Sequence, residues 1–309
     1  MVIRDAELSG SVRPQTIYFE ATEALKTETG ISVSPSGYMI KKPYYRAVSS
    51  ASPLMEYTAF SGLTAEDIAA VYPTAVQLRE YGFGDPYSAC TFNLAVQRTN
   101  TETDENGEEV YTFSYYNVFK YTVKLGNENE DGLRYAVVYA EDELFPVVYL
   151  VDESGIEWAD AQYDDMADTL LFYIHIVSVE RMTLTLDGTT TTFELTHTPS
   201  EDGTSTDLAV TAGGTAYDDD EFRDVYTGLM GMYRTGKADG VPAGSPVLTV
   251  SIESNTASVQ DVQIKLYQQS ASKYTVVQST GEIYSVNAKT VEAFLDQYRA
   301  FLGDMVEEF

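Results

Sequence analysis

The sequence predicts an α+β protein made of two tandem repeated domains, each an antiparallel sheet packed by amphipathic helices. Three observations lead to this fold class. Some segments space their apolar residues as helices do, others alternate apolar and polar residues as strands do, and the order of these segments occurs twice. The chain has 309 residues, which at about 150 residues per domain also favours two domains.

Two long segments have the apolar spacing of amphipathic helices. In residues 217–236 and 288–305 apolar side chains recur three or four positions apart, so each segment has one stripe to bury. Asn287 is a good N-cap for the second helix, and the acidic residues 218–221 favour the dipole at the start of the first. Two shorter helices are predicted at residues 64–72 and 160–173.

Between the helices, apolar and polar residues alternate with a period of two. Residues 182–186 and 193–195 alternate on either side of Asp187 and Gly188, a two-residue turn signal, and so predict a β-hairpin. Further strands are predicted at residues 133–139, 147–151 and 262–267. Antiparallel sheets with one covered face fit this alternation best.

The order of the elements then repeats. Residues 91–94 and 249–252 begin equivalent series of strands, and Tyr149 and Tyr284 lie in the last strand of each. The separation of equivalent positions shrinks along the series, which predicts extra length in the first copy, within the acidic loop at residues 101–109. The predicted parts are an irregular N-terminal segment or tether at residues 1–30, a first repeat domain at 31–175 and a second at 176–309.

Composition excludes several classes of function. Lys and Arg number 19 against 48 Asp and Glu, and the net charge of −29 repels nucleic-acid phosphates and anionic lipid surfaces. Nucleic acid is therefore not an expected partner. No apolar run approaches the roughly 18 residues of a membrane-spanning helix. The single Cys90 allows no internal disulfide and leaves the redox compartment open.

A turn-and-strand pattern resembles a known bacterial family. Residues 81–86 read Tyr-Gly-Phe-Gly-Asp-Pro, and strands, a Val-Tyr-Leu-Val-Asp segment at 148–152 and a helix follow; a divergent turn at 244–246 begins the second copy. Over roughly residues 40–305, as two copies, this resembles a family of unknown function. Its members are usually anchored in the cell envelope, and some are encoded beside gliding-type ABC-transporter genes.

The resemblance implies a location and partners, and it supplies no catalytic residues. The location is extracytoplasmic and associated with the cell envelope, with membrane contact only through an N-terminal anchor or signal absent from these residues. The implied partners are proteins of the envelope, including membrane transporter subunits.

Acidic loops are the first candidate metal sites, because Ca²⁺ prefers carboxylate and amide oxygens. Asn127, Asn129 and Asp131 match the start of an EF-hand loop, but its twelfth position holds Val138 instead of a glutamate. A polar hairpin loop is the favoured interpretation. Residues 104–109 are likewise interpreted as a solvated turn, and weak calcium association there stays open.

Other chemistry-bearing residues also have structural explanations. The carboxylates of residues 218–221 diverge by about 100° per helical position, so they do not converge on one ion. His175 lies in the most apolar run and is predicted to be a core or domain-junction residue, while His197 is expected at the surface. Cys90 is predicted to be buried. No catalytic, metal or cofactor-binding residue is assigned, and the sequence predicts that the protein is not an enzyme.

Tyrosine is abundant, with 24 residues. Two predicted strand faces are aromatic: one contains Tyr111, Phe113 and Tyr115, and the other contains Tyr135 and Tyr139. Such faces stack on sugars or form protein interfaces. Tyrosine also favours half-buried sheet faces, and a structural role in the sheet is the preferred interpretation. Trp158 is likewise predicted to be buried. We therefore expect a non-catalytic extracytoplasmic interaction or scaffold protein, auxiliary to an ABC-transporter-type assembly if the resemblance holds. The alternative is a glycan-binding module that uses Tyr-rich sheet faces, and a carboxylate-based hydrolase ranks below both.

Overall fold

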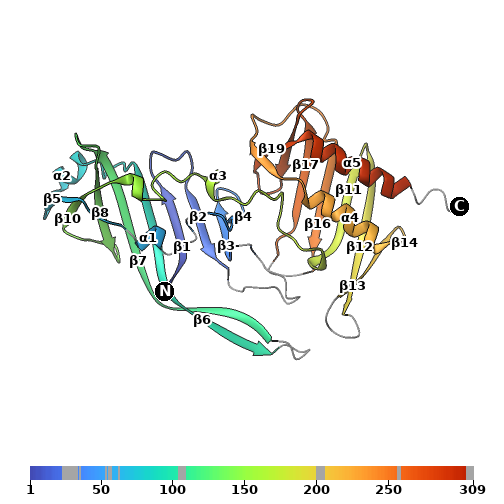
Figure 1. The fold of residues 1–309 in the computed structure, drawn as a ribbon, viewed down its shortest axis with the longest axis horizontal. Helices are drawn as coiled ribbons and strands as arrows, with labels where there is room; N and C mark the ends of the chain where they lie inside the picture. The colour runs from blue at the N-terminus through green and yellow to red at the C-terminus, as the bar shows by residue number, and fades with distance from the viewer. Residues whose placement is uncertain are drawn as a thin grey trace. The chain divides into compact units, whose positions relative to one another are not determined.

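The chain is largely β with some helices and forms two sheet bodies (Figure 1). The computed structural model describes residues 1–22, 34, 36–52, 54, 58–61, 63–103, 109–199, 206–255 and 259–303. Two units divide between Asp168 and Thr169; the first unit here means the described residues up to 168, and the second means those from 169 to 303. Each unit contains one antiparallel sheet.

The first unit has a ten-stranded sheet in the order β4-β3-β2-β1-β6-β7-β8-β10-β5, with β9 paired to β8. Its strands are β1 (Val2–Ser9), β2 (Ile17–Ala21), β3 (Tyr38–Lys42), β4 (Arg46–Ala47), β5 (Asp67–Val71), β6 (Ser88–Thr103), β7 (Glu109–Glu128), β8 (Arg134–Ala140), β9 (Glu143–Leu144) and β10 (Val147–Val151). Its helices are α1 (Thr58–Ser61), α2 (Ala75–Glu80) and α3 (Tyr163–Met166).

The second unit has a nine-stranded sheet in the order β14-β13-β12-β11-β16-β17-β18-β19-β15. Its strands are β11 (Val179–Leu186), β12 (Thr189–Pro199), β13 (Thr206–Ala212), β14 (Thr215–Tyr217), β15 (Arg234–Lys237), β16 (Leu248–Ser254), β17 (Val262–Gln268), β18 (Lys273–Gln278) and β19 (Ile283–Asn287). Its helices are α4 (Asp219–Met230) and α5 (Ala288–Gly303).

The two sheets share one strand order. Each main strand of the first sheet has a counterpart at the same place in the second sheet and in the same order along the chain. The equivalent pairs used below are β5 with β15, β7 with β17, β8 with β18, and β10 with β19.

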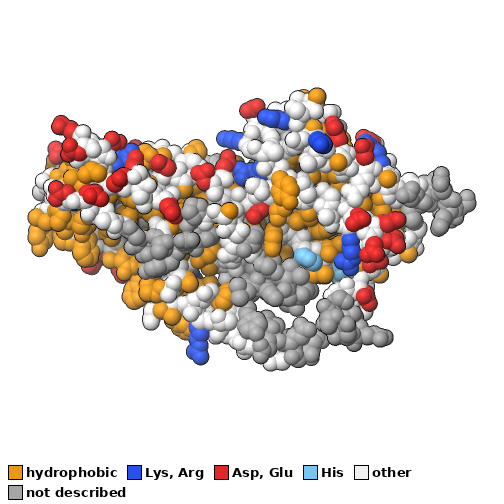
Figure 2. Space-filling view, viewed as in Figure 1, with side chains coloured by type: hydrophobic (Ala, Val, Ile, Leu, Met, Phe, Trp, Pro, Cys, Tyr) orange, Lys and Arg blue, Asp and Glu red, His pale blue; other side chains and the backbone are white. Residues whose placement is uncertain are grey.

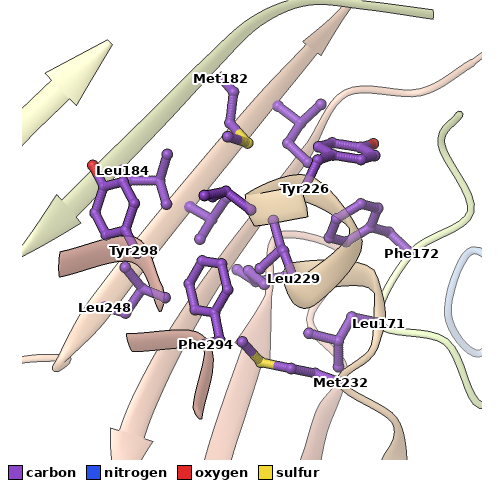
Figure 3. Close-up of a cluster of buried hydrophobic side chains, with 14 of the residues drawn as sticks. Leu171, Phe172, Met182, Leu184, Tyr226, Leu229, Met232, Leu248, Phe294 and Tyr298 are labelled. Atoms are coloured by element: carbon purple, nitrogen blue, oxygen red, sulfur yellow. The ribbon is translucent and has the colours of Figure 1, made fainter. Parts of the chain in front are cut away.

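Helices α4 and α5 bury the stripes that their sequences predict. Residues 217–236 and 288–305 are helical at 219–230 and at 288–303, the limit of the described residues. Figure 3 shows Leu229 of α4 and Phe294 and Tyr298 of α5 gathered with Leu184 and Leu248 of the sheet, all of them buried. The predicted hairpin also forms, as β11 and β12.

A buried arginine organises the core of the first unit. The guanidinium of Arg13, in the β1–β2 turn, donates from Nε to the Ala161 carbonyl and from Nη2 to the Ala159 carbonyl, both at 2.8 Å, and also to the Trp158 carbonyl. Its Nη1 donates to the Ser9 carbonyl and the Ser88 hydroxyl, both at 2.8 Å. These bonds hold the segment at 158–161 against the sheet, with the Trp158 ring fully buried, as predicted.

Several predicted elements are wrong in the first unit. Within residues 1–30, β1 and β2 lie inside the sheet instead of forming a tether, because a bulge between Ile3 and Asp5 hides the strand alternation of β1. Within residues 160–173 only α3 is α-helical, because the carbonyls of the preceding turn accept from Arg13 and the chain continues irregularly.

Residues 64–72 were predicted as a helix, but they contain strand β5. Pairing of β5 with β10 overrides the local helical spacing.

The extra length of the first copy also differs from the prediction. It consists of paired strands, because β6 and β7 have 16 and 20 residues where β16 and β17 have 7 each. Residues 104–108 of the predicted acidic loop lie outside the described residues.

Candidate functional site

The acidic motifs have structural roles. The turn between β7 and β8 is the polar hairpin loop that the sequence predicts: Asn129 Oδ1 accepts the backbone N–H groups of Asp131 and Leu133 at 3.0 and 2.8 Å. Asp218 caps α4 by accepting the Glu221 N–H at 3.0 Å. Within the described ranges, no group of three or more His, Cys, Asp or Glu residues is placed to hold a metal ion.

His175 does not lie in a core, and His197 is not fully at the surface as predicted. His175 is exposed, because the chain buries its neighbour Ile176 through a short 3₁₀ turn that the His175 imidazole caps. His197 is half-buried, with Nε2 at 2.8 Å from the Val179 carbonyl, because β12 packs it beside the start of β11. Cys90 is fully buried as predicted, and burial raises the pKa of its thiol, which suppresses the nucleophilic thiolate.

The aromatic faces are half-buried sheet faces, as preferred from the sequence. Tyr135 and Tyr139 pack around Phe83, and the rings of Tyr81 and Tyr135 lie 4.3 Å apart. Tyr115 is half-buried and donates its hydroxyl to the Thr22 carbonyl at 3.3 Å. The side chain of Tyr111 lies outside the described residues.

An apolar surface at one end of the first unit was not predicted from the sequence. Figure 2 shows hydrophobic side chains gathered at the end that Figure 1 labels β5 and β10. The large exposed hydrophobic residues there are Ile68, Val71, Tyr72, Val76 and Phe145. Contiguous exposed apolar surface is uncommon on soluble proteins and marks interaction sites.

Part of this surface lies on a single face of the sheet. Ile68 of β5 pairs with Tyr149 of β10, and Val71 pairs with Val147. Directly paired residues project to the same side of a sheet, so Ile68 and Val71 share a face with Tyr149. They remain 55% and 61% exposed. We call Ile68, Val71 and Phe145, together with the adjoining groove, the apolar face.

A groove of about 330 Å³ adjoins these residues. Its lining residues are Leu63, Thr64, Ala65, Val123, Ala136, Val138, Phe145, Tyr149 and Val151. Among the described residues of this lining, the hydroxyls of Thr64 and Tyr149 are the only polar side-chain groups. Phe145 is 54% exposed, so the groove opens to solvent beside it. Its volume lies in the range of about 300–1,000 Å³ that is typical of ligand pockets.

The equivalent edge of the second unit is charged. Strand β15 ends its sheet as β5 ends the first, and it reads Arg-Thr-Gly-Lys. Lys237 of β15 pairs with Tyr284, the residue equivalent to Tyr149, so Lys237 stands where the first unit has Ile68. A lysine on an edge strand disfavours pairing with another chain. The first unit lacks this protection at the same position.

Comparison with protein-family models, with curated proteins and with solved structures finds no match to this chain. None of the described helices is long and apolar enough to cross a membrane. The interpretation of the apolar face therefore depends on the geometry of the first unit alone.

Proposed function

We propose that this chain is a non-catalytic interaction or scaffold protein of the bacterial cell envelope, built from two tandem repeats of one α+β domain. In this proposal the apolar face of the first unit binds a protein partner. The second unit has the same sheet order with a lysine at the equivalent edge position.

The tandem repeat is supported by details beyond strand order. Tyr149 and Tyr284 occupy equivalent places, and three residues after each an Asx side chain caps the following turn. The Oδ1 atoms of Asp152 and Asn287 each accept the backbone N–H of the residue two positions later, both at 2.9 Å. Duplication of one domain accounts for this agreement.

The observation that carries the binding proposal is the contrast between Ile68 and Lys237. At one register position, one unit has an exposed aliphatic side chain and the other has an ammonium group. An exposed apolar residue on an edge strand is an aggregation hazard unless a partner covers it. A partner that covers Ile68, Val71 and Phe145 explains why these exposed apolar residues stand at this edge.

The resemblance carried by residues 81–86 and 148–152 supports an envelope location and a partner among the subunits of an ABC-transporter-type assembly. The glycan-binding alternative has less support, because Tyr115, Tyr135 and Tyr139 pack against their own unit.

The test is a pull-down from solubilised envelope membranes of the source bacterium, read by mass spectrometry. Three full-length baits are compared: wild type, Ile68→Lys, which introduces the lysine of β15, and Val241→Lys, which makes the same charge change at an exposed aliphatic residue of the second unit. Transporter subunits are expected with wild type and Val241→Lys and are expected to be lost with Ile68→Lys. Recovery of the same proteins by all three baits, or of no membrane protein, contradicts the proposal.

A further inference from the structure

Four strands end the two sheets, and three of them offer little to another chain. These strands are β4, β5, β14 and β15. The outer side of β4 is covered within its own unit, where the Asp168 N–H donates to the Ala47 carbonyl at 3.0 Å and Val48 forms a bridge with Ala167. Strand β14 has only three residues, and β15 contains Lys237. Covered edges, short edge strands and edge lysines all prevent pairing with other chains.

Strand β5 has none of these protections. It has five residues, which read Asp-Ile-Ala-Ala-Val and include no lysine, arginine or proline. Figure 1 shows it at the end of the first sheet, and among the described residues no segment pairs with its outer side. The side chains of Ile68 and Val71 are more than half exposed. Strand β5 is therefore open both along its edge and on its apolar face.

The backbone of Val71 points away from the sheet. Val71 pairs with Val147, and the N–H of the next residue, Tyr72, donates to the Pro146 carbonyl at 2.7 Å. In an antiparallel ladder, bonds so placed flank a non-hydrogen-bonded pair, whose own N–H and C=O groups point outward. The Val147 N–H agrees with this, because it donates to the Phe145 carbonyl at 2.7 Å. The N–H and C=O groups of Val71 thus face the side on which a further strand would lie.

We propose that an extended segment of the protein partner adds to β5 as a further strand of the first sheet. Backbone donors and acceptors along a sheet edge are satisfied by another strand, whereas a helix uses its own backbone groups internally. Ile68 and Val71 share one face, so the added strand has apolar side chains on that face. This inference rests on the proposed function and names the way in which the partner docks.

Charge selects the ends of the added strand. Glu66 and Asp67 are exposed at the start of β5, and residues 65–72 contain no lysine or arginine. A lysine or arginine of the partner is therefore favoured beside them. A second copy of this chain is disfavoured, because each copy has a net charge of −29.

The test adds two full-length baits to the pull-down from solubilised envelope membranes. Val71→Pro removes the outward N–H but retains an apolar side chain, and proline is tolerated on an edge strand where the sheet does not use the N–H. Val71→Thr is the matched control, because it retains the N–H and the branched shape but is less apolar. Thermal melts establish that both baits are folded. We expect Val71→Pro to lower the recovery of transporter subunits about tenfold, and Val71→Thr to lower it less than about threefold.

Hydrogen–deuterium exchange reads the same edge without a substitution. In the eluted complex of the wild-type bait, amides within residues 67–72 are expected to exchange about tenfold or more slowly than in the free chain, because the added strand accepts hydrogen bonds from them.

Three results overturn the strand inference and leave the proposed function, which the Ile68→Lys bait reads separately. They are equal recovery by Val71→Pro and wild type, a larger loss with Val71→Thr than with Val71→Pro, and unchanged exchange at residues 67–72 in the complex. Capture of a second copy of the chain in place of a transporter subunit, or of no membrane protein by wild type, contradicts both.

Discussion

Replacement of Arg13 by methionine tests how the first unit is held together. Arg13 is 6% exposed, and methionine retains an unbranched side chain but removes every donor of the guanidinium. The substitution leaves the carbonyls of Ser9, Trp158, Ala159 and Ala161 and the Ser88 hydroxyl without this partner.

The expected loss is smaller than a sum over these bonds. A hydrogen bond to a charged group contributes about 1.5–3 kcal/mol, so five bonds add to more than about 7 kcal/mol. Desolvation of the guanidinium offsets part of this gain, and burial lowers the pKa of Arg13 accordingly. Each buried acceptor left without a donor costs about 1–3 kcal/mol, and removal of the guanidinium regains its desolvation cost, so we expect Arg13→Met to lower the free energy of unfolding by about 3–5 kcal/mol.

The assay is urea denaturation followed by tryptophan fluorescence. Trp158 is the single tryptophan of the chain, and its backbone carbonyl is one of the acceptors of Arg13. The signal therefore reports the first unit alone. Arg13→Lys retains the charge and some donors and is expected to lose less stability. A change below about 1 kcal/mol in Arg13→Met would refute the view that this residue holds the segment at 158–161 in place.

Three further predictions concern stability. Gly126→Ala should cost at least about 2 kcal/mol in the same assay, because its Cβ would lie 2.0 Å from the Tyr81 carbonyl oxygen; wild-type stability would contradict this. Gly228→Ala in α4 should be neutral or stabilise by up to about 1 kcal/mol in thermal melts, because the clash is only with the flexible end of Gln297; a large loss would contradict it. Burial raises the pKa of Tyr38 to about 12 from 10.0, so the folded state keeps the phenol proton to a higher pH than the unfolded state does. Its contribution is fully present below about pH 10 and is lost as pH rises to about 12, by at most about 2.7 kcal/mol. Tyr38→Phe should flatten this part of the profile in urea titrations, and an unchanged slope would contradict the assignment.

The sequence predicts the elements whose apolar spacing and whose cap or turn residues all lie within one segment of the chain. Helix α5 has both its cap at Asn287 and its apolar stripe within one segment, and the β11–β12 hairpin has its turn at Asp187 and Gly188. Elements that depend on distant partners are missed. The irregular course after Trp158 is determined by Arg13, which lies 145 positions away along the chain.

The candidate site was missed for the same reason. Ile68 and Val71 are three positions apart, which is a helical spacing when read locally. Pairing with β10 across a register shift between Val148 and Tyr149 makes them exposed residues of an edge strand. Their contrast with Lys237 becomes visible only when the registers of the two sheets are aligned.

Site-specific photocrosslinking in the source organism tests most directly whether the apolar face binds a partner. A photoreactive residue is introduced at Ile68 or Phe145, and at Val241 as the control on the second unit. The proposal predicts adducts with a membrane transporter subunit from positions 68 and 145 and none from 241. Absence of adducts at 68 and 145, or the same adducts from position 241, would contradict it.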